Sequence, residues 1–286
     1  MARLFGSAGA ARIANSHVMV IGIGGVGSWA AECLARSGVG RITLVDMDHV
    51  AESNINRQIQ ASDASLGMAK IVAMQAHILG YHPQCQVQLV DDFVTPENWA
   101  SVYAQAAQVQ GIDAVIDCCD QVKTKTALAA WAQKCGMGKR GTFISVGAAG
   151  GKKLAQLVEV ADLSEVTHDP LLAQVRYRLR RSAREAAGAS QPEGSAAKQK
   201  NKKMGISCVF SREAVEQPQA DQAQTDAASC VAPAATAELQ AHNLSCAGYG
   251  SFVGVTATFG MVASSVILGG LVKQRVNPTA VLNLEL

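Results

Sequence analysis

The stretch HVMVIGIGGVGSW at residues 17–29 decides the fold of this chain. Its first five residues are mostly apolar and predict a buried strand, and residues 26–37 predict a helix that Gly38 ends in a left-handed conformation. Between them, the glycines of residues 22–27 permit a tight turn and let a phosphate approach the helix N–H groups. A G-x-G-x-x-G pattern between a strand and a helix predicts a nucleotide-binding loop.

Strand and helix patterns alternate through the first half of the chain. Strands are predicted at residues 17–21, 41–45, 86–90, 114–118 and 143–146. Helices are predicted at residues 26–37, 62–79, 95–108 and 122–135. Buried strands that alternate with helices predict an α/β fold with a doubly wound, mostly parallel, Rossmann-like sheet.

The second half of the chain differs in composition. A strand, a helix and a short strand are predicted at residues 154–160, 171–187 and 207–211. Residues 188–203 and 217–237 have too few large apolar side chains to form a core and predict mobile surface loops. We therefore expect a nucleotide-binding domain at 1–151 and a C-terminal extension at 152–286 that packs as one unit.

Residues 251–272 carry no charged side chain, and a run of this length is long enough to cross a membrane. The segment also contains glycines and hydroxyl residues, and a helix inside an α/β domain is likewise apolar on all sides. We therefore expect an apolar helix buried within the C-terminal extension, with membrane association as the minor alternative.

The overall composition is typical of a globular enzyme. The chain has 286 residues, of which 49% are apolar, and its net charge of +2 does not indicate a polyanionic partner for the whole molecule. The eight cysteines include no C-x-x-C pair, so we expect no zinc. Residues 1–14 lack the apolar centre of a secretory signal, and we expect a cytoplasmic protein with reduced cysteines.

Polar residues beyond the second predicted strand indicate which nucleotide binds. Asp46 ends that strand and is placed to accept hydrogen bonds from ribose hydroxyls. Arg57 and Lys70 follow where a dinucleotide enzyme needs no cation, whereas a departing pyrophosphate needs fixed cations as its charge builds. Asp120, just after the fourth predicted strand, is a candidate Mg²⁺ ligand. Together these residues predict that ATP is bound and cleaved.

Each of these residues also has a simpler interpretation. Arg57 can solvate a loop, Lys70 can lie on an exposed helix face, and Asp120 can cap the helix at 122–135. The glycine loop with Asp46 would equally suit a nicotinamide-dependent oxidoreductase. Their joint occurrence around one predicted crevice favours ATP cleavage over these separate explanations.

The order and spacing of these residues resemble the adenylation domain of the ubiquitin-activating superfamily, which includes the ThiF- and MoeB-like activators of thiamine and molybdopterin biosynthesis. The resemblance covers about residues 3–151. It rests on Gly22, Gly24, Gly25, Gly27, Ser28, Asp46, Asp48, Ser53, Asn54, Arg57, Gln58, Lys70, Asp117 and Asp120.

This resemblance implies a role for each matching residue. Asp46 is expected to hold the ribose, Asn54, Arg57 and Lys70 to contact the phosphates, and Asp120 to bind Mg²⁺. It also implies a homodimer in which an N-terminal arginine reaches the ATP of the partner subunit. The candidate catalytic residues are Arg57, Lys70 and Asp120, and the candidate ATP-binding residues are Arg3, Gly22, Gly24, Gly25, Gly27, Asp46, Asp48, Asn54, Arg57, Gln58 and Lys70.

Further stretches resemble one group within this superfamily, the tRNA threonylcarbamoyladenosine dehydratases. They lie at residues 3–6, 22–29, 91–96, 169–171, 205–211 and 256–260. The resemblance implies ATP-dependent adenylation of the threonyl carboxylate of N6-threonylcarbamoyladenosine in tRNA, followed by cyclisation with loss of water. Because the attacking carbamoyl group is tethered to the same base, no catalytic cysteine is required. Residues 217–237 and the pair Cys118-Cys119 depart from the pattern of this group.

Three alternatives stay open at this point. The chain can activate a ubiquitin-like sulfur-carrier protein and engage a sulfur-transfer partner, for which Cys208, Cys230 and Cys246 are candidate thiols. It can be a nicotinamide-dependent oxidoreductase or a non-catalytic nucleotide-dependent scaffold. Activators of thiamine and molybdopterin biosynthesis commonly carry two C-x-x-C zinc pairs, and their absence from the sequence favours tRNA over a protein substrate.

A basic segment in the second half supports the same substrate. Its cations outnumber two acids, Glu185 and Glu193, and a basic stripe can follow an RNA backbone. A solvated helix face is the alternative. The basic residues are Arg176, Arg178, Arg180, Arg181, Arg184, Lys198, Lys200, Lys202 and Lys203.

Overall fold

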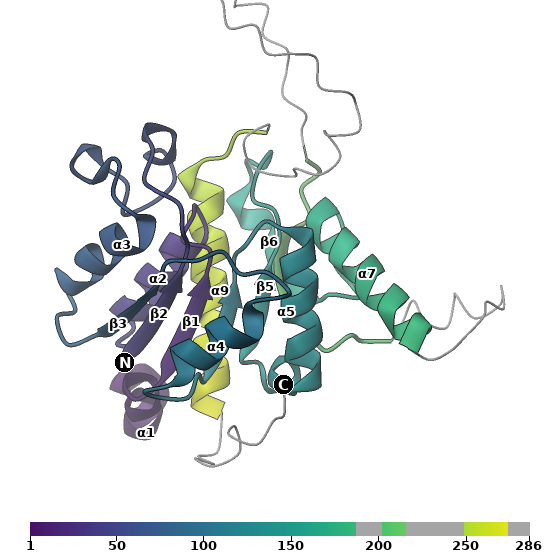
Figure 1. Cartoon of the computed structure of the whole chain (residues 1–286), viewed down its shortest axis with the longest axis horizontal. Helices are drawn as coiled ribbons and strands as arrows, with labels where there is room; N and C mark the ends of the chain where they lie inside the picture. Colours follow the sequence, from purple (N-terminus) through teal and green to yellow (C-terminus); the bar gives the residue numbers. More distant parts are fainter. Residues whose placement is uncertain (187–201, 216–248, 274–286) are drawn as a thin grey trace, which may run out of the picture.

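A seven-stranded sheet forms the centre of the computed structural model, which describes residues 1–186, 202–215 and 249–273 (Figure 1). The strand order is β3-β2-β1-β4-β5-β7-β6, and all neighbours are parallel except β6 and β7. The predicted α/β fold with a doubly wound, mostly parallel sheet is therefore confirmed. The strands are β1 (His17–Ile21), β2 (Arg41–Val45), β3 (Gln86–Val90), β4 (Ala114–Asp117), β5 (Phe143–Val146), β6 (Val158–Asp162) and β7 (Ser207–Ser211).

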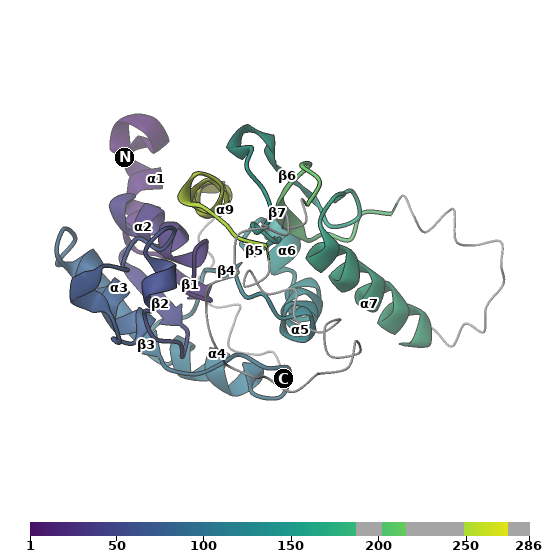
Figure 2. The ribbon, with the colours of Figure 1, turned by 90° about the horizontal axis from the view of Figure 1, so that it is seen from above.

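Both faces of the sheet are covered by helices, which explains why the central strands are apolar throughout. Along β1, Val18 and Val20 point into one apolar core and Met19 and Ile21 into another, because successive side chains of a strand alternate between faces. Figure 2 shows α9 on one side of the sheet and α4 and α5 on the other. The helices are α1 (Ala2–Ala14), α2 (Gly27–Arg36), α3 (Lys70–Leu79), α4 (Trp99–Ala107), α5 (Val122–Lys134), α6 (Met137–Arg140), α7 (Pro170–Ala186) and α9 (Val253–Lys273).

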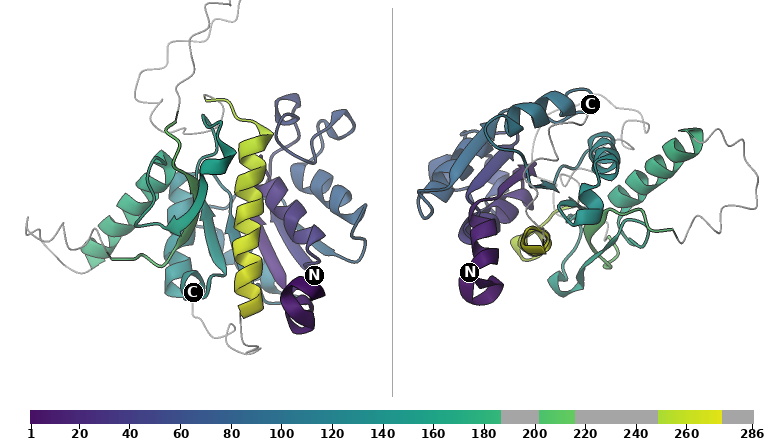
Figure 3. Two further views of the ribbon diagram at one scale, coloured as in Figure 1. Left: turned by 180° about the vertical axis from the view of Figure 1, so that it is seen from behind. Right: turned by 90° about the horizontal axis from the view of Figure 1, so that it is seen from below.

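Helix α9 packs against α2 and runs along the sheet, with α1 beside its far end (Figure 3). A Cβ on Gly260 would lie 2.5 Å from the carbonyl oxygen of Val26, so glycine is required for this close approach. The Ser264 hydroxyl donates to the carbonyl of Ala30 at 2.9 Å. Among the described residues, α9 is the one helix with the length and apolar composition of a membrane span, and 56% of its most apolar stretch is buried.

Three predicted elements begin at least four residues later in the structure. The helix expected at 62–79 begins only at Lys70, because Gly67 has a φ of 77° and interrupts the chain after the short 3-10 helix Asp63–Ser65. The helix expected at 95–108 begins at Trp99, after Thr95 and Asn98 exchange side-chain hydrogen bonds with each other's N–H groups. The strand expected at 154–160 begins at Val158 because the 3-10 helix Ala155–Leu157 precedes it.

The predicted C-terminal extension contributes to the same sheet as the first 151 residues. Strand β7 pairs in parallel with β5 and antiparallel with β6, so the sheet continues past the predicted boundary, which itself stays a prediction. Helix α7 points away from the sheet at its C-terminal end (Figures 1 and 2). The loop predicted at 217–237 and most of that predicted at 188–203 lie outside the described residues.

Candidate functional site

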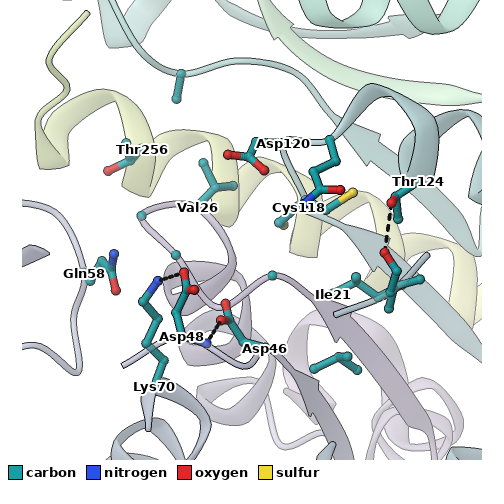
Figure 4. Close-up of a pocket in the computed structure, with 18 of the residues that line it drawn as sticks. Ile21, Val26, Asp46, Asp48, Gln58, Lys70, Cys118, Asp120, Thr124 and Thr256 are labelled. Carbon is teal, nitrogen blue, oxygen red and sulfur yellow. Dashed lines mark hydrogen bonds and ion pairs between the residues drawn. The ribbon is translucent and has the colours of Figure 1, made fainter. Parts of the chain in front are cut away.

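An open cleft of about 350 Å³ lies at the carboxyl ends of the parallel strands (Figure 4). Its lining includes the ends of β1, β2, β4 and β5 together with the first turn of α9. From β1 the chain continues outward to β2 and β3, and it then returns to β4 on the other side of β1, so the strand order reverses between β1 and β4. Ligands of doubly wound sheets bind at this kind of switch point.

The glycine loop forms the floor of the cleft and owes its shape to its glycines. Gly22 has a φ of 85°, and a Cβ on Gly27 would lie 1.8 Å from the Gly22 carbonyl oxygen. Nothing lies within 4 Å of a Cβ built on Gly24, and one on Gly25 would contact Arg57 Cγ at 3.2 Å. Gly22, Gly24 and Gly25 line the cleft, whereas Gly27 closes the turn behind them.

Asp46 lies beside this loop and is held rigidly. Its Oδ2 accepts the N–H of Ile23 at 2.6 Å, and its Oδ1 accepts the N–H of Asp48 at 2.9 Å. The side chain is buried, and burial raises the pKa of Asp46 above its ordinary value even though Lys70 and the two N–H groups oppose the shift. A buried carboxylate fixed at the end of β2 suits the ribose of a nucleotide.

Lys70 reaches the cleft from the first residue of α3. Its ammonium nitrogen lies 2.6 Å from Oδ2 of Asp48, and the residue is buried (Figure 4). The backbone N–H of Lys70 also donates to the Asp48 carbonyl at 2.9 Å. The simpler interpretation of Lys70 as a residue of an exposed helix face is therefore wrong.

Arg57 lines the cleft beside Gly25 of the glycine loop. Its guanidinium donates to the carbonyl of Ser53 at 2.6 Å and to Oδ1 of Asn56 at 2.9 Å. Asn56 in turn donates to the Ser251 carbonyl, which ties this loop to the chain before α9. The remaining predicted residues, Asn54 and Gln58, are buried and also line the cleft.

Asp120 lies in the loop after β4 and faces the cleft (Figure 4). The N-cap of α5 is Gln121 without a side-chain capping bond, so the capping interpretation of Asp120 is wrong. Within the described part of the chain, the Asp120 carboxylate has no hydrogen bond or ion pair. The same residues contain no group of three or more His, Cys, Asp or Glu side chains that could hold a metal ion. A single free carboxylate fits Mg²⁺ that keeps most of its ligands from phosphates and water.

A buried ion pair supports the loop that carries Asp120. Lys125 Nζ lies 2.8 Å from Asp117 Oδ2, and neither side chain is exposed. Burial alone would lower the pKa of Lys125, but the Asp117 carboxylate raises it above its ordinary value. The other oxygen of Asp117 accepts the N–H of Cys119 at 3.2 Å and thereby turns the chain toward Asp120.

Arg3 is the one predicted site residue that lies far from the cleft. It is exposed in α1, whose Gly9 contacts Val272 near the end of α9. The cleft contacts the opposite end of α9 through Thr256, which is about 24 Å away at about 1.5 Å per residue. The Arg3 of the same chain therefore does not reach this cleft.

The structure adds lining residues that the sequence did not single out as site residues. They follow the ends of β3 and β5 or come from the first turns of α5, α7 and α9, which are distant in sequence. The rule that ligands bind beyond the carboxyl ends of strands points to the loops after β3 and β5. Five of the residues lie in the stretches 91–96, 169–171 and 256–260, whose resemblance to the dehydratases gave them no role in the site. These residues are Asp92, Phe93, Val94, Thr124, Gly147, Ala148, Ala149, Leu171 and Thr256.

Cysteines in the described part of the chain show no sign of activation. Cys118 and Cys119 line the cleft, but burial raises the pKa of Cys118 to about 12 and that of Cys119 well above its ordinary value. Burial also raises the pKa of Cys208 well above its ordinary value. The other candidate thiols, Cys230 and Cys246, lie outside the described residues.

Basic side chains cluster on the outer part of α7. Arg176 is not among them, because its guanidinium donates to the carbonyls of Leu163 and Val166 at 3.1 and 2.6 Å. Arg181 and Arg184 are exposed, and so is Tyr177 at 62%. Lys202 and Lys203 are exposed as well, whereas Lys198, Lys200 and Glu193 lie outside the described residues.

Comparisons with known proteins identify the family of the chain. Residues 1–274 match the ThiF family. The chain is 40% identical to the tRNA threonylcarbamoyladenosine dehydratase of Escherichia coli over 92% of this chain and 89% of that protein, and 35% identical to the Haemophilus influenzae enzyme of the same name over 96% and 92%. The crystal structure of the E. coli enzyme in complex with ATP superposes with a TM-score of 0.71 at 38% identity, covering 94% of this chain and 91% of that chain. This chain therefore belongs to the ThiF family.

Proposed function

We propose that the chain is an ATP-dependent tRNA threonylcarbamoyladenosine dehydratase. It adenylates the threonyl carboxylate of N6-threonylcarbamoyladenosine in tRNA and then closes the cyclic product. The observation that carries the proposal is the convergence of the glycine loop, Asp46, Lys70, Arg57 and Asp120 on one cleft. The choice of substrate is supported by relatives that bear this name and align over nearly the full chain. One of them was crystallised with ATP.

In the first step the threonyl carboxylate attacks the α-phosphorus of ATP. A bond forms between carboxylate oxygen and phosphorus, and the bond from that phosphorus to the β-bridging oxygen breaks, so pyrophosphate leaves. Asp46 orients the ribose, and the N–H groups at the start of α2 face the phosphates. Arg57 and Lys70 stabilise the charge that builds on pyrophosphate.

In the second step the carbamoyl group of the same modification attacks the acyl carbon. The new bond closes the ring, one proton leaves the carbamoyl nitrogen, and AMP departs with the former carboxylate oxygen. The substrate thus loses the atoms of one water. Because this nucleophile is tethered to the acyl group, its high effective molarity replaces a protein thiol, in accord with the raised pKa values of Cys118 and Cys119.

We propose Asp120 as the residue that holds Mg²⁺. The ion supplies charge neutralisation for the phosphates when bound. The free carboxylate, its position in the cleft and the mostly buried network of Asp117, Cys119 and Lys125 in the same loop and helix all support this role. No zinc is part of the proposal.

We propose that tRNA contacts the arginines of α7. Helix α7 begins at the cleft wall with Leu171 and carries its exposed cations toward its outer end. Arg181 pairs with Glu185 at 2.8 Å, but both side chains are more than half exposed, so an RNA phosphate can compete for the guanidinium at little cost. Contact with phosphates positions an RNA without reading its sequence.

We also propose a homodimer in which Arg3 acts in the partner's cleft. Arg3 lies far from its own cleft, and the outward face of α9 carries exposed Val253, Met261 and Ser265 without a charge. Subunit mixing tests this arrangement. Arg3→Ala and Lys70→Ala subunits, each inactive alone, should together restore one working cleft per mixed dimer, and no restoration would contradict action between subunits. A cytoplasmic location and a sulfur-transfer partner also remain proposals.

The test of the proposed function measures both products of the reaction. Purified chain is incubated with ATP, Mg²⁺ and tRNA bearing threonylcarbamoyladenosine, and the tRNA is digested for nucleoside mass spectrometry. We expect the modified nucleoside to lose the mass of one water with release of AMP and pyrophosphate. Unmodified tRNA should give no product. Pyrophosphate exchange stimulated only by a sulfur-carrier protein, or tight NAD binding without exchange, would overturn the proposal.

A further inference from the structure

The cleft has a second wall that no nucleotide residue occupies. It consists of residues 147–149 after β5 and Leu171 in the first turn of α7. The glycine loop and Asp46 belong to β1 and β2, on the other side of the switch point. Ligands of doubly wound sheets bind in the crevice at the carboxyl ends of the strands, and this wall is a part of the crevice that has no assigned contact with the nucleotide.

One buried carboxylate joins the two parts of this wall. Asp169 Oδ2 accepts the N–H of Ala148 at 2.9 Å, and Oδ1 accepts the N–H of Leu172 at 2.9 Å. The second bond caps α7, which has Pro170 at its first position. A Cβ on Gly147 would lie 2.0 Å from Asp169 Oδ2, so the strand end approaches the carboxylate as closely as glycine allows.

The position of Asp169 is itself fixed from outside the cleft. Among the described residues, His168 is the one non-glycine residue with a positive φ, at 56°. Buried Lys152 holds it by donating to the His168 carbonyl at 3.3 Å, and also to the carbonyls of Ser211 and Glu213 at 3.0 and 3.1 Å. A residue kept in this sparsely populated backbone region indicates that the surrounding contacts determine its conformation.

We propose that Asp169 is a positioning residue for the second substrate of the proposed reaction. Its two hydrogen bonds join residues 147–149 to the start of α7. The second wall of the cleft and the helix that carries the exposed arginines are thereby held in a fixed relative position. A carboxylate carried on RNA bound along α7 is thereby delivered to the cleft at a fixed distance. The inference rests on the proposed function and assigns the second wall to the tRNA-borne threonyl group.

The test separates the two substrates kinetically. In Asp169→Asn the side chain keeps one acceptor oxygen for the α7 cap and turns an NH₂ group toward the Ala148 N–H, so the wall loosens. We expect kcat/KM for modified tRNA to fall about tenfold or more, since a displacement of about 1 Å can cost two orders of magnitude. The KM for ATP should stay within about twofold, because Asp169 bonds to Ala148 and Leu172 and to no residue assigned to ATP.

Asp162→Asn is the matched control. Asp162 accepts N–H groups from Ser164, Met204 and Gly205 but does not line the cleft. This variant should lower the unfolding temperature. It should not lower kcat/KM for modified tRNA while leaving the KM for ATP unchanged. Equal shifts for ATP and tRNA in Asp169→Asn, no shift in either, or the same split in Asp162→Asn would overturn the positioning role.

A second variant covers the case in which Asp169→Asn does not fold. Gly147→Ala places a methyl group against Asp169 Oδ2 and should give the same split between tRNA and ATP. If neither variant folds, as judged by ATP binding, the carboxylate is purely structural and the inference is wrong. Wild-type chain is assayed first, because a wild type that cannot turn over modified tRNA contradicts the proposed function and not the role of Asp169.

Discussion

Lys70 and Asp48 form an ion pair of 2.6 Å at the edge of the cleft, with the lysine side chain 9% exposed and the aspartate 52% exposed. The pair holds the ammonium group beside Asp46 before any phosphate arrives. Because Asp48 is largely solvated, an incoming phosphate can take over the ammonium without stranding a buried charge. The cation is thus oriented in advance, which is the condition for electrostatic stabilisation of a leaving group.

Replacing Lys70 by Met should abolish most of the turnover and leave the fold intact. Loss of one preorganised donor to the departing pyrophosphate lowers kcat by about two orders of magnitude. Steady-state assays of AMP release measure the effect, with exposed Lys123→Met in α5 as the control. A Lys70→Met enzyme with wild-type kcat would show that the ammonium does not contact the phosphates.

Asp120→Asn should change the requirement for Mg²⁺. The Asp120 carboxylate has no partner within the described residues, so the substitution costs little stability. An amide is a weaker Mg²⁺ ligand than a carboxylate, and the Mg²⁺ concentration for half-maximal rate should rise about tenfold. A Mg²⁺ titration at saturating ATP measures this shift. The same midpoint in both enzymes would remove Asp120 from the metal site.

Two glycines of α9 should respond in opposite directions to alanine. A methyl group on Gly260 meets the Val26 carbonyl at 2.5 Å, and we expect a loss of about 1–3 kcal/mol and a raised KM for ATP, because α2 carries the glycine loop. Nothing lies within 4 Å of a Cβ on Gly269, so Gly269→Ala should stabilise the chain by about 0.5–1 kcal/mol. Urea unfolding and ATP titration measure both effects. Equal stability of the two variants would contradict the close packing of α9 on α2.

The cysteines of the cleft should be dispensable. With a pKa of about 12, about one Cys118 side chain in ten thousand is a thiolate at pH 8. Iodoacetamide at pH 8 should therefore modify Cys118 far more slowly in the folded chain than in urea, and the reaction should accelerate as the pH rises. Cys118→Ala should retain activity within about threefold, since no step needs a protein thiol. Loss of the cyclisation step alone in this variant would contradict that mechanism.

The sequence predicted those parts of the fold and site that depend on local pattern. The strand and helix that flank the glycine loop, and Asp46 after the next strand, lie within one β-α-β unit, so their spacing alone predicted that they lie together. Lys70 lies in the predicted cleft, but its helix was predicted to begin at residue 62 and begins at Lys70. The positive φ of Gly67 interrupts the chain there, and the spacing of apolar residues does not reveal it.

Other features depend on long-range packing that no local pattern encodes. Thr256 reaches the cleft only because Gly260 lets α9 lie against α2, and Asp169 reaches Ala148 only because α7 begins beside the end of β5. The loop that carries Asp120 is likewise supported by the buried ion pair of Lys125 with Asp117. The sequence shows Lys125 only as one lysine of a predicted helix. Roles for these residues in catalysis stay predictions until the variants are measured.

The placement of α9 has a consequence for how the chain matures during synthesis. The helix beginning at Val253 packs on α2 and lines the cleft through Thr256, although the glycine loop is made more than two hundred residues earlier. A nascent chain on the ribosome therefore exposes the apolar face of α2 until α9 has been translated. Contacts so distant in sequence also slow the final folding step. We therefore expect nucleotide binding only after α9 has been translated. A chain truncated before α9 should bind chaperones and should not bind ATP.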